Sequence, residues 1–520
     1  MSTSAKEIPF LIGEDFVQRR NVAWRVELGE PDPENPLLEP EMPWDNDHPF
    51  LHGTVLRDPI DGLWKAWGAA AAHDPYRYHA RRLAYLESED GVRWRRPELE
   101  LCPYGEHKRT NILLDVDSGG NLSCMSVIVN PDAHESRRYE MFVLRRPGWP
   151  AELSGTDVAK GFGTPEGGEA RERGIYHYTS SDGIHWNADV GPVLLENNDP
   201  LRQDATSDNS YFFRQEDGTY VSYHKKSIRG FPGNIIPYEL GPGGCRILVQ
   251  RRSGDGIHWD PLELCMLPDW RDTNDTQFME MGVSPVSGGY LGVVTLYRTG
   301  NQALELQFAA SRDGRYWWRP DRRACVSMPS LGEYGGGMMW GSHNPVEDGD
   351  RLHFYYTGTQ GLHGDIFSTE EADLAEAEGR PYKRLAPLHG EVLARVPSLI
   401  FHHGAFCRAS WKRGRLWALT TASGGNLEGE ATTRASIGQG ETLDVSAATF
   451  RDGELRAELV GEDGRATEGF DRDACDLFSG DTMRTTVTWN GKAAVPTDGL
   501  QVRFVLRNAR LYGFEFAQPN

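Results

Sequence analysis

The chain has 520 residues, of which 38% are hydrophobic and 10% aromatic, and its formal net charge at pH 7 is −21. This length exceeds the usual size of one compact core, so a large domain and a smaller one are expected. The negative charge argues against nucleic acid and anionic membranes as partners, because both bind to dense cationic faces. No apolar run has the length of a signal peptide or a membrane span, so we expect a cytoplasmic protein.

The first 40 residues are rich in proline and acidic side chains and predict an irregular leader, residues 1–40. After the leader, the sequence Ser-x-Asp-Gly-x-x-Trp occurs four times, at residues 88–94, 180–186, 253–259 and 311–317. Each copy follows a short β-like run. The Asp-Gly pair provides the positive φ angles of a tight hairpin, and the Trp can bury its ring against the neighbouring unit. Four copies in register indicate a repeat architecture made of β-strands.

The repeats divide residues 41–385 into five units, which predicts a five-bladed β-propeller. The fifth unit lacks the motif, as is common for a terminal repeat, and such a unit often borrows a strand from the other end of its domain. The units lie near residues 53–94, 111–186, 203–259, 278–317 and 338–357. Beyond residue 385, short strands alternate with Gly and Asp turns, which predicts an antiparallel β-sandwich over residues 386–520. The expected fold class is therefore all-β.

The seven cysteines are scattered along the chain, and none belongs to a Cys-x-x-Cys pair. Their odd number and wide spacing suggest neither a disulfide framework nor a zinc site. We expect them to be buried free thiols.

The repeated motif resembles the blade ends of the furanosidase-type five-bladed propeller glycoside hydrolases, which include invertases, fructanases, levansucrases and arabinanases. A β-sandwich follows the propeller in the invertase-like branch, and the order and sizes are similar here over nearly the whole chain. The resemblance implies a glycosidase that cleaves a furanoside, such as a fructosyl or arabinosyl unit, without a cofactor. The sialidase motif is one residue longer, and its arginine triad has no counterpart that can be placed in this sequence.

Glycoside hydrolysis generally needs two carboxyl groups, one ionised and one protonated, on either side of the scissile bond. In a propeller these groups should stand at the axis, in the loops that lead into the innermost strands. The segment Trp44-Asp45-Asn46-Asp47 resembles the Trp-x-Asn-Asp loop that holds the nucleophile of invertase-like enzymes. The resemblance implies Asp47 as the nucleophile, Asp45 as its substitute, and Trp44 and Asn46 as substrate ligands. The loop departs from the family pattern after Asp47, and a solvated acidic turn is the alternative.

The third unit offers a second pair of acids. Asp204 and Asp208 precede its inner strand, beside the amides of Gln203 and Asn209, which can hold sugar hydroxyls. Either acid could orient the substrate or stabilise positive charge on the ring, and capping of a tight loop is the alternative. The string Arg57-Asp58-Pro59 spells the family's transition-state stabiliser, but it lies inside a hairpin and is interpreted as turn chemistry.

The fourth unit contains Gln277 and Glu280 at its inner strand. Apolar neighbours flank Glu280, and desolvation raises the pKa of such a carboxyl, so Glu280 is the predicted general acid. The family's Glu-Cys signature is missing, and a salt-bridged structural Glu is the alternative. Glu333, in the fifth unit, is the substitute.

The fifth unit contains Trp340 and His343, with His363 nearby, which could line the pocket. Trp stacks on sugar faces, and His donates to hydroxyls. In arabinanase-like propellers a His lies near a central calcium ion, so the resemblance suggests a structural calcium at His343. A satisfied buried His is the more ordinary interpretation. Asp115 and Asp117 of the second unit are weaker candidates.

Two other functions stay open. A propeller glycoside phosphorylase would replace the water or second carboxylate with a cationic phosphate pocket, for which Lys225, Lys226 and Arg229 are candidates. A non-catalytic carbohydrate-binding propeller would keep the aromatic residues without an opposed acid pair. In each case the expected partner is a small carbohydrate, with no nucleic acid and no membrane, and the chain could assemble as a homo-oligomer.

Overall fold

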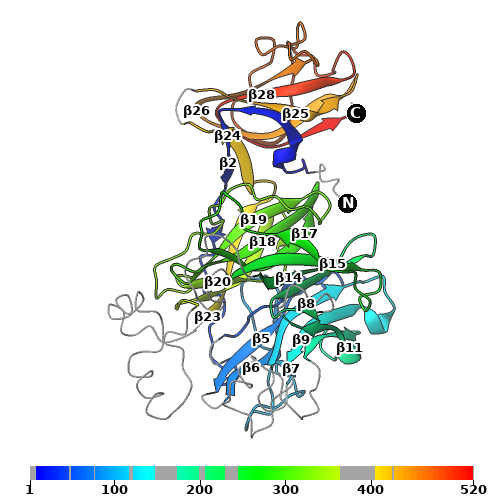
Figure 1. Cartoon of the computed structure of the whole chain (residues 1–520), viewed down its shortest axis with the longest axis vertical. Helices are drawn as coiled ribbons and strands as arrows, with labels where there is room; N and C mark the ends of the chain where they lie inside the picture. The colour runs from blue at the N-terminus through cyan, green and yellow to red at the C-terminus, as the bar shows by residue number, and fades with distance from the viewer. Residues whose placement is uncertain are drawn as a thin grey trace.

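The computed structural model describes residues 7–45, 48–74, 77–115, 121–146, 173–197, 205–228, 244–363, 404–423 and 427–518. Within these ranges the strands form four sheets, and the helices are two three-residue 3-10 turns, Gly13–Asp15 and Glu135–Arg137. In this described part, no helix is long and apolar enough to cross a membrane. The predicted all-β class is confirmed. The strands gather in a larger and a smaller lobe (Figure 1).

The larger lobe consists of five consecutive antiparallel units. Units one and two share a nine-stranded sheet, and units four and five share an eight-stranded sheet. Unit one comprises β4 (Thr54–Arg57), β5 (Trp64–Asp74), β6 (Arg77–Ser88) and β7 (Ile112–Leu114). Unit two comprises β8 (Asn121–Val129), β9 (Tyr139–Arg146), β10 (Gly174–Ser180) and β11 (Asn187–Glu196), with β12 (Ala205–Thr206) beside β11.

The other three units follow in the same order. Unit three comprises β13 (Ser210–Arg214), β14 (Tyr220–Ile228), β15 (Cys245–Ser253) and β16 (Glu263–Met266). Unit four comprises β17 (Thr276–Val286), β18 (Gly289–Arg298) and β19 (Ala303–Ser311). Unit five comprises β20 (Met338–Gly341), β21 (Val346–Asp348), β22 (Arg351–Thr359) and β23 (Gly404–Lys412). The predicted boundary at residue 385 thus precedes β23, which pairs with β22 of unit five.

Hydrogen bonds join the first strand of each unit, or the residues beside it, to the next unit. Units one and two are joined by the Thr54 hydroxyl, which donates to the Met125 carbonyl at 2.9 Å, and units two and three by the Phe212 amide, which donates to Ser126 Oγ at 3.0 Å. The Tyr211 hydroxyl of unit three donates to the Val283 carbonyl of unit four at 2.7 Å. The Val283 amide donates to the carbonyl of His343 in unit five at 2.9 Å. The His343 amide then donates to the Gly53 carbonyl at 2.8 Å, which leads from unit five back to unit one.

The four Ser-x-Asp-Gly-x-x-Trp motifs have one common shape. In every copy the Ser hydroxyl donates to the Asp carboxylate at 3.0 Å, and that carboxylate accepts two backbone N–H groups. Only the glycines have positive φ angles, between 68° and 77°. The expectation that the Asp-Gly pair provides the positive φ angles of a tight hairpin is therefore wrong for the Asp residues and holds for the glycines alone. Capping by the Asp carboxylate stabilises a longer loop instead.

Each motif packs against the preceding unit. Trp94 contacts Tyr355 of unit five with ring centroids 5.6 Å apart, and Trp317 contacts Tyr223 of unit three at 5.5 Å. The Tyr355 hydroxyl also donates to the Gly91 carbonyl at 2.8 Å, and the Tyr223 hydroxyl to the Gly314 carbonyl at 2.7 Å. The expectation that the Trp rings bury against neighbouring units is confirmed for these two motifs.

The leader is not irregular throughout, contrary to the prediction. It contains β1 (Phe16–Arg20), β2 (Val22–Val26) and β3 (Glu30–Pro31). β1 pairs with β25 (Gly429–Ile437), β2 with β24 (Trp417–Thr421), and β3 with β23 at the edge of unit five. These strands depend on partners about 400 residues away in the chain, which the local composition of the leader cannot reveal.

The smaller lobe is one seven-stranded sheet, formed by β1, β2, β24, β25, β26 (Thr442–Val460), β27 (Asp481–Thr486) and β28 (Leu500–Ala517). The pairing of β26 with β28 is interrupted between Thr449 and Glu454, where Arg451 has a φ of 49°. The halves of β26 on either side of this interruption both contribute to one hydrophobic core, for example through Leu443 and Leu459. The sheet therefore folds over on itself at this point.

Candidate functional site

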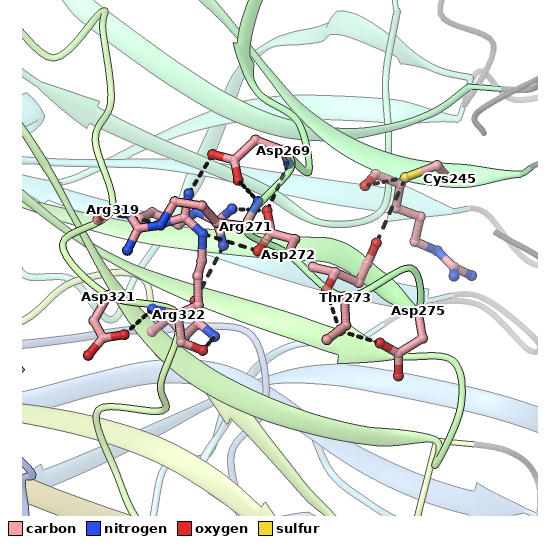
Figure 2. Close-up of polar contacts among 12 residues, drawn as sticks. Cys245, Asp269, Arg271, Asp272, Thr273, Asp275, Arg319, Asp321 and Arg322 are labelled. Carbon is pink, nitrogen blue, oxygen red and sulfur yellow. Dashed lines mark hydrogen bonds and ion pairs between the residues drawn. The ribbon is translucent and has the colours of Figure 1, made fainter. Parts of the chain in front are cut away.

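Ion pairs hold the segment that leads into β17 (Figure 2). Asp272 pairs with Arg319 and, at 3.2 Å, with Arg322, which also contacts Asp269 at 2.5 Å. Burial would raise the pKa of Asp272, but the hydrogen bond and charge of Arg319 more than offset it and hold that pKa below its usual range. The side chains of Asp272 and Arg319 are only 1% and 2% exposed. These contacts fix the position at which β17 begins, and so the positions of the side chains that follow.

Glu280 lies on β17 and is buried. Its Oε2 atom is 3.0 Å from Nδ1 of His52, and its Oε1 atom accepts a hydrogen bond from the Thr295 hydroxyl at 3.3 Å. The pairing of β17 with β18 shifts between Phe278 and Glu280. Such bulges re-aim a side chain and are frequent next to active sites. The predicted acid is therefore held by two side chains from different strands or loops.

His52 is the residue at this site that sequence reasoning missed. It precedes β4, is 3% exposed and has a φ of 47°, in the left-handed region. Its ring meets the Trp340 ring edge-on, with centroids 4.7 Å apart. Holding a non-glycine residue in this backbone conformation costs about 1–3 kcal/mol of free energy, and residues held in this way cluster at functional sites. The sequence around His52 contains no motif that could have identified it.

A line of contacts leads from Trp340 towards unit three. The half-buried Trp340 lies 5.8 Å from the His363 ring, which lies 4.6 Å from the Tyr297 ring. The Arg246 guanidinium lies over Tyr297 at 5.5 Å and donates to Gln277 Oε1 at 2.6 Å. These contacts connect Trp340, His363 and Gln277, and their role in lining a pocket stays a prediction.

Asp208, before β13, lies in a cationic surrounding. Its Oδ1 atom is 2.7 Å from Lys225 Nζ, and its Oδ2 atom is 3.7 Å from Arg146 Nη2. Burial would raise the pKa of Asp208, but the charges of Lys225, Arg146 and Arg246 and the hydrogen bond from Lys225 hold that pKa well below its usual range. The side chain is one-third exposed. Asp208 is therefore ionised at neutral pH and accessible.

Within the described ranges, basic groups outnumber acidic ones around Asp208. Arg146 and Arg173 both contact Glu196, the latter at 3.1 Å, and Lys226 donates to the Asn197 carbonyl at 2.5 Å. Beside Asp208, Asn209 is 5% exposed, and its Nδ2 atom has no hydrogen-bond partner among the described residues. This amide can serve as a ligand for a bound oxygen atom.

The first predicted loop is only partly described. Asn46 and Asp47 lie outside the described residues, as do Asp117, Gln203, Asp204 and Arg229. Asp45 accepts hydrogen bonds from the Glu41 and Met42 amides and pairs with Arg96 at 2.5 Å. Trp44 is buried and donates to Asn111 Oδ1 at 2.6 Å. Asp45 caps a turn and is buried, so it does not belong to the solvated acidic turn that the sequence left open as the alternative.

The remaining candidates have local structural contacts. The exposed Glu333 accepts the Ser330 amide at 3.2 Å within a turn. His343 is buried, with Nδ1 3.1 Å from Ser126 Oγ, and burial together with the charge of His52 lowers its pKa to about 3. Asp58 pairs with Lys65 at 2.5 Å in its hairpin, which agrees with the turn interpretation. No group of three or more His, Cys, Asp or Glu side chains in the described ranges is arranged to hold a metal ion.

No family model and no curated protein matches the sequence. Solved structures that resemble the fold include a glycosyl hydrolase from Bacteroides ovatus, with 14% identity and a TM-score of 0.43 over 68% of this chain and 95% of that one. Another is the beta-1,2-mannobiose phosphorylase from Listeria innocua, with 12% identity and a TM-score of 0.42 over 76% and 97%. A third is an N-acetylgalactosamine deacetylase from F. plautii, with 12% identity and a TM-score of 0.41 over 79% and 96%. At these identities and TM-scores, the likenesses assign no activity to this chain.

Proposed function

We propose that the protein is a carbohydrate-active enzyme that cleaves a glycosidic bond at the centre of a five-bladed β-propeller. The five hydrogen bonds between successive inner strands support a closed ring, because the last one returns from His343 to Gly53. The contact of Tyr355, on β22, with Gly91, in the loop after β6, supports the same closure. Closure would bring Asp208, which precedes β13, and Glu280, which lies in the first half of β17, towards the axis.

The observation that carries the proposal is the contrast between the two carboxyl groups. Glycosidic cleavage uses one ionised carboxylate and one group that delivers a proton. Lys225 and Arg146 keep Asp208 ionised, whereas Glu280 is buried and shares a hydrogen bond with His52. The Glu280–His52 pair is therefore the proton-delivering element, and Asp208 stabilises positive charge on the sugar or activates the attacking group. Trp340 supplies an apolar face for the sugar ring.

The substrate class is a furanoside with a fructosyl or arabinosyl unit, on the strength of the motif resemblance. Asp47 and Asp204 remain predicted members of the site. Hydrolysis is the first candidate reaction, because it needs only water in addition to the side chains described above.

Phosphorolysis is the second candidate, and the basic groups around Asp208 favour it. Lys225, Arg146, Arg173 and Arg246 surround the Asp208 and Glu196 carboxylates. Guanidinium groups bind phosphate through paired hydrogen bonds. In this reaction a phosphate oxygen would attack the anomeric carbon, and a sugar phosphate would be released in place of a free sugar.

Sugar release from aryl furanosides, aryl pyranosides, sucrose and fructans, with and without inorganic phosphate, tests both candidates. Glu280→Gln and Asp208→Asn should each lower turnover by at least about 10²-fold, since general acid–base groups contribute about 10²–10⁴-fold. The exposed Glu263→Gln and Asp132→Asn are matched controls that should retain activity. Turnover only with phosphate would favour the phosphorylase, and binding of a sugar without any turnover would favour a carbohydrate-binding protein.

A further inference from the structure

We propose that His52 delivers the proton to the glycosidic oxygen through its Nε2 atom, and that Glu280 acts as the positioning residue that orients the imidazole. This inference rests on the proposed function. The sequence pointed to Glu280 as the acid, but the contacts of the Glu280–His52 pair divide the two tasks differently.

Glu280 is poorly placed to reach a substrate. Both of its oxygens are in contact with protein groups, Oε2 with His52 and Oε1 with Thr295. The proposal places the hydrogen between Oε2 and Nδ1 on His52, so that Glu280 is the acceptor. A carboxylate on Nδ1 fixes the ring orientation and tautomer, and leaves Nε2 as the nitrogen that exchanges protons.

The backbone around His52 keeps the ring in place. The His52 carbonyl accepts the Met125 amide at 3.0 Å, and the next carbonyl, of Gly53, accepts the His343 amide at 2.8 Å. A Cβ atom on Gly53 would lie only 2.0 Å from the Trp67 carbonyl oxygen, so the chain passes here in close contact with β5. These contacts hold the left-handed φ of His52, which the residue would otherwise relax.

The imidazole lies beside the proposed sugar-stacking group, because its ring meets Trp340 edge-on with centroids 4.7 Å apart. Among the described residues, the side-chain hydrogen bond of His52 is made by Nδ1, with Glu280. A sugar ring stacked on the half-buried Trp340 would therefore place its glycosidic oxygen next to His52. Glu280 contacts the Nδ1 atom of His52, so the imidazole ring would lie between Glu280 and the substrate.

The proton balance of the step is complete. The His52 imidazolium gives its Nε2 proton to the glycosidic oxygen, which takes the electron pair of the breaking bond to the anomeric carbon. Neutral His52 keeps the hydrogen on Nδ1, directed at the Glu280 carboxylate. Water attacks the anomeric carbon and loses a proton to an ionised carboxylate, for which Asp208 is the candidate, and the proton returns through solvent to Nε2.

Leaving-group dependence tests the assignment. The substrate panel first identifies the sugar, and its phenyl and 2,4-dinitrophenyl glycosides are then compared. The phenyl glycoside needs an acid, because phenol is a poor leaving group unless it is protonated. The 2,4-dinitrophenyl glycoside does not, because its leaving group departs as the anion. His52→Gly suits the left-handed backbone, and it should lose about 10²–10⁴-fold on the phenyl glycoside but less than about 10-fold on the activated one. Added imidazole should restore part of the activity on the phenyl glycoside. The double variant with Glu280→Gln should be no slower than His52→Gly alone, because both changes act on one proton transfer.

The opposite pattern would overturn the proposal: a leaving-group-dependent loss in Glu280→Gln that exceeds the loss in His52→Gly, with formate rescuing Glu280→Gly and imidazole failing to rescue His52→Gly. The tautomer provides a test that needs no turnover, so it remains informative if the proposed function fails. In ¹⁵N NMR spectra recorded at a pH where the ring is neutral, the His52 signals, assigned by their absence from His52→Asn, should show the hydrogen on Nδ1. A neutral ring with its hydrogen on Nε2 in the wild type would contradict the assignment.

Discussion

The Tyr355 hydroxyl of unit five donates a hydrogen bond of 2.8 Å to the Gly91 carbonyl of unit one, across 264 positions of the chain. Tyr355 is fully buried, and the same carbonyl also accepts from Arg408 at 3.2 Å. Between units three and four, Tyr223 makes the corresponding contact with Gly314 at 2.7 Å. The same hydrogen bond, from a Tyr hydroxyl to a Gly carbonyl, thus joins units three and four, which are consecutive in sequence, and units five and one, which are far apart in sequence.

Tyr355→Phe should lower the free energy of unfolding by about 1 kcal/mol, the usual net value of a buried hydrogen bond. Tyr223→Phe is the matched comparison, because it removes the equivalent bond between units three and four. Urea unfolding of the two variants beside the wild type measures both losses. A loss in Tyr223→Phe without any loss in Tyr355→Phe would argue against a closed ring.

Arg319→Met should destabilise the protein by about 3–5 kcal/mol, because it leaves the Asp272 carboxylate buried without its main partner. It should also lower activity, since the segment that sets the start of β17 loosens. Arg315→Met is the control, because it breaks the solvent-exposed pair with Glu263. Denaturant unfolding and turnover of both variants check the prediction, and equal stability of the two would refute it.

Much of the fold was predictable because its signals are local. The Ser-x-Asp-Gly-x-x-Trp motif identified the units, since the Ser and Asp side chains and the Gly conformation are all set within seven residues. The strands of the leader were not predictable. Pairings such as Arg20 with Glu430 involve residues that are remote in sequence, and no periodicity in either segment reveals the partner.

The candidate site depends on both local and remote features of the sequence. Glu280 stood out because apolar residues flank an acid within a strand. The contacts that define its chemistry come from elsewhere: His52 lies 228 residues away in the chain, and its left-handed backbone follows from packing rather than from residue type. Likewise, the basic side chains around Asp208 come from β9, β14 and β15, which only the folded chain brings together.

Asp208→Asn should lower the free energy of unfolding at pH 7, because Lys225 and Arg146 then lose the negatively charged carboxylate with which they pair. The folded-state pKa of Asp208 is depressed, so its contribution is present above the unfolded pKa of about 4 and is lost as the pH falls below it. The stability difference between wild type and variant should therefore shrink between pH 5 and the lowest pH at which both fold. Unfolding curves across this range, with Asp132→Asn as the control, measure it; a difference that grows on acidification would contradict the ion pairing.

His343 should make the protein less stable in mild acid. Its pKa is about 3 in the folded state and about 6.5 when unfolded, so the unfolded chain binds the extra proton first as the pH falls below about 6.5. The free energy of unfolding should then decrease by up to about 1.4 kcal/mol per pH unit from this residue. His343→Gln should flatten the slope between pH 6.5 and 4.5, whereas the exposed His134→Gln should leave it unchanged. An unaltered slope in His343→Gln would show that His343 does not contribute.

Sugar release by the wild type beside Glu280→Gln, measured on the substrate panel with and without phosphate, tests whether this protein cleaves glycosidic bonds through Glu280. We expect turnover of a furanoside by the wild type and a loss of at least about 10²-fold in the variant. Absence of turnover on every substrate under both conditions, with sugar binding retained, would contradict it and would make the protein a carbohydrate-binding propeller.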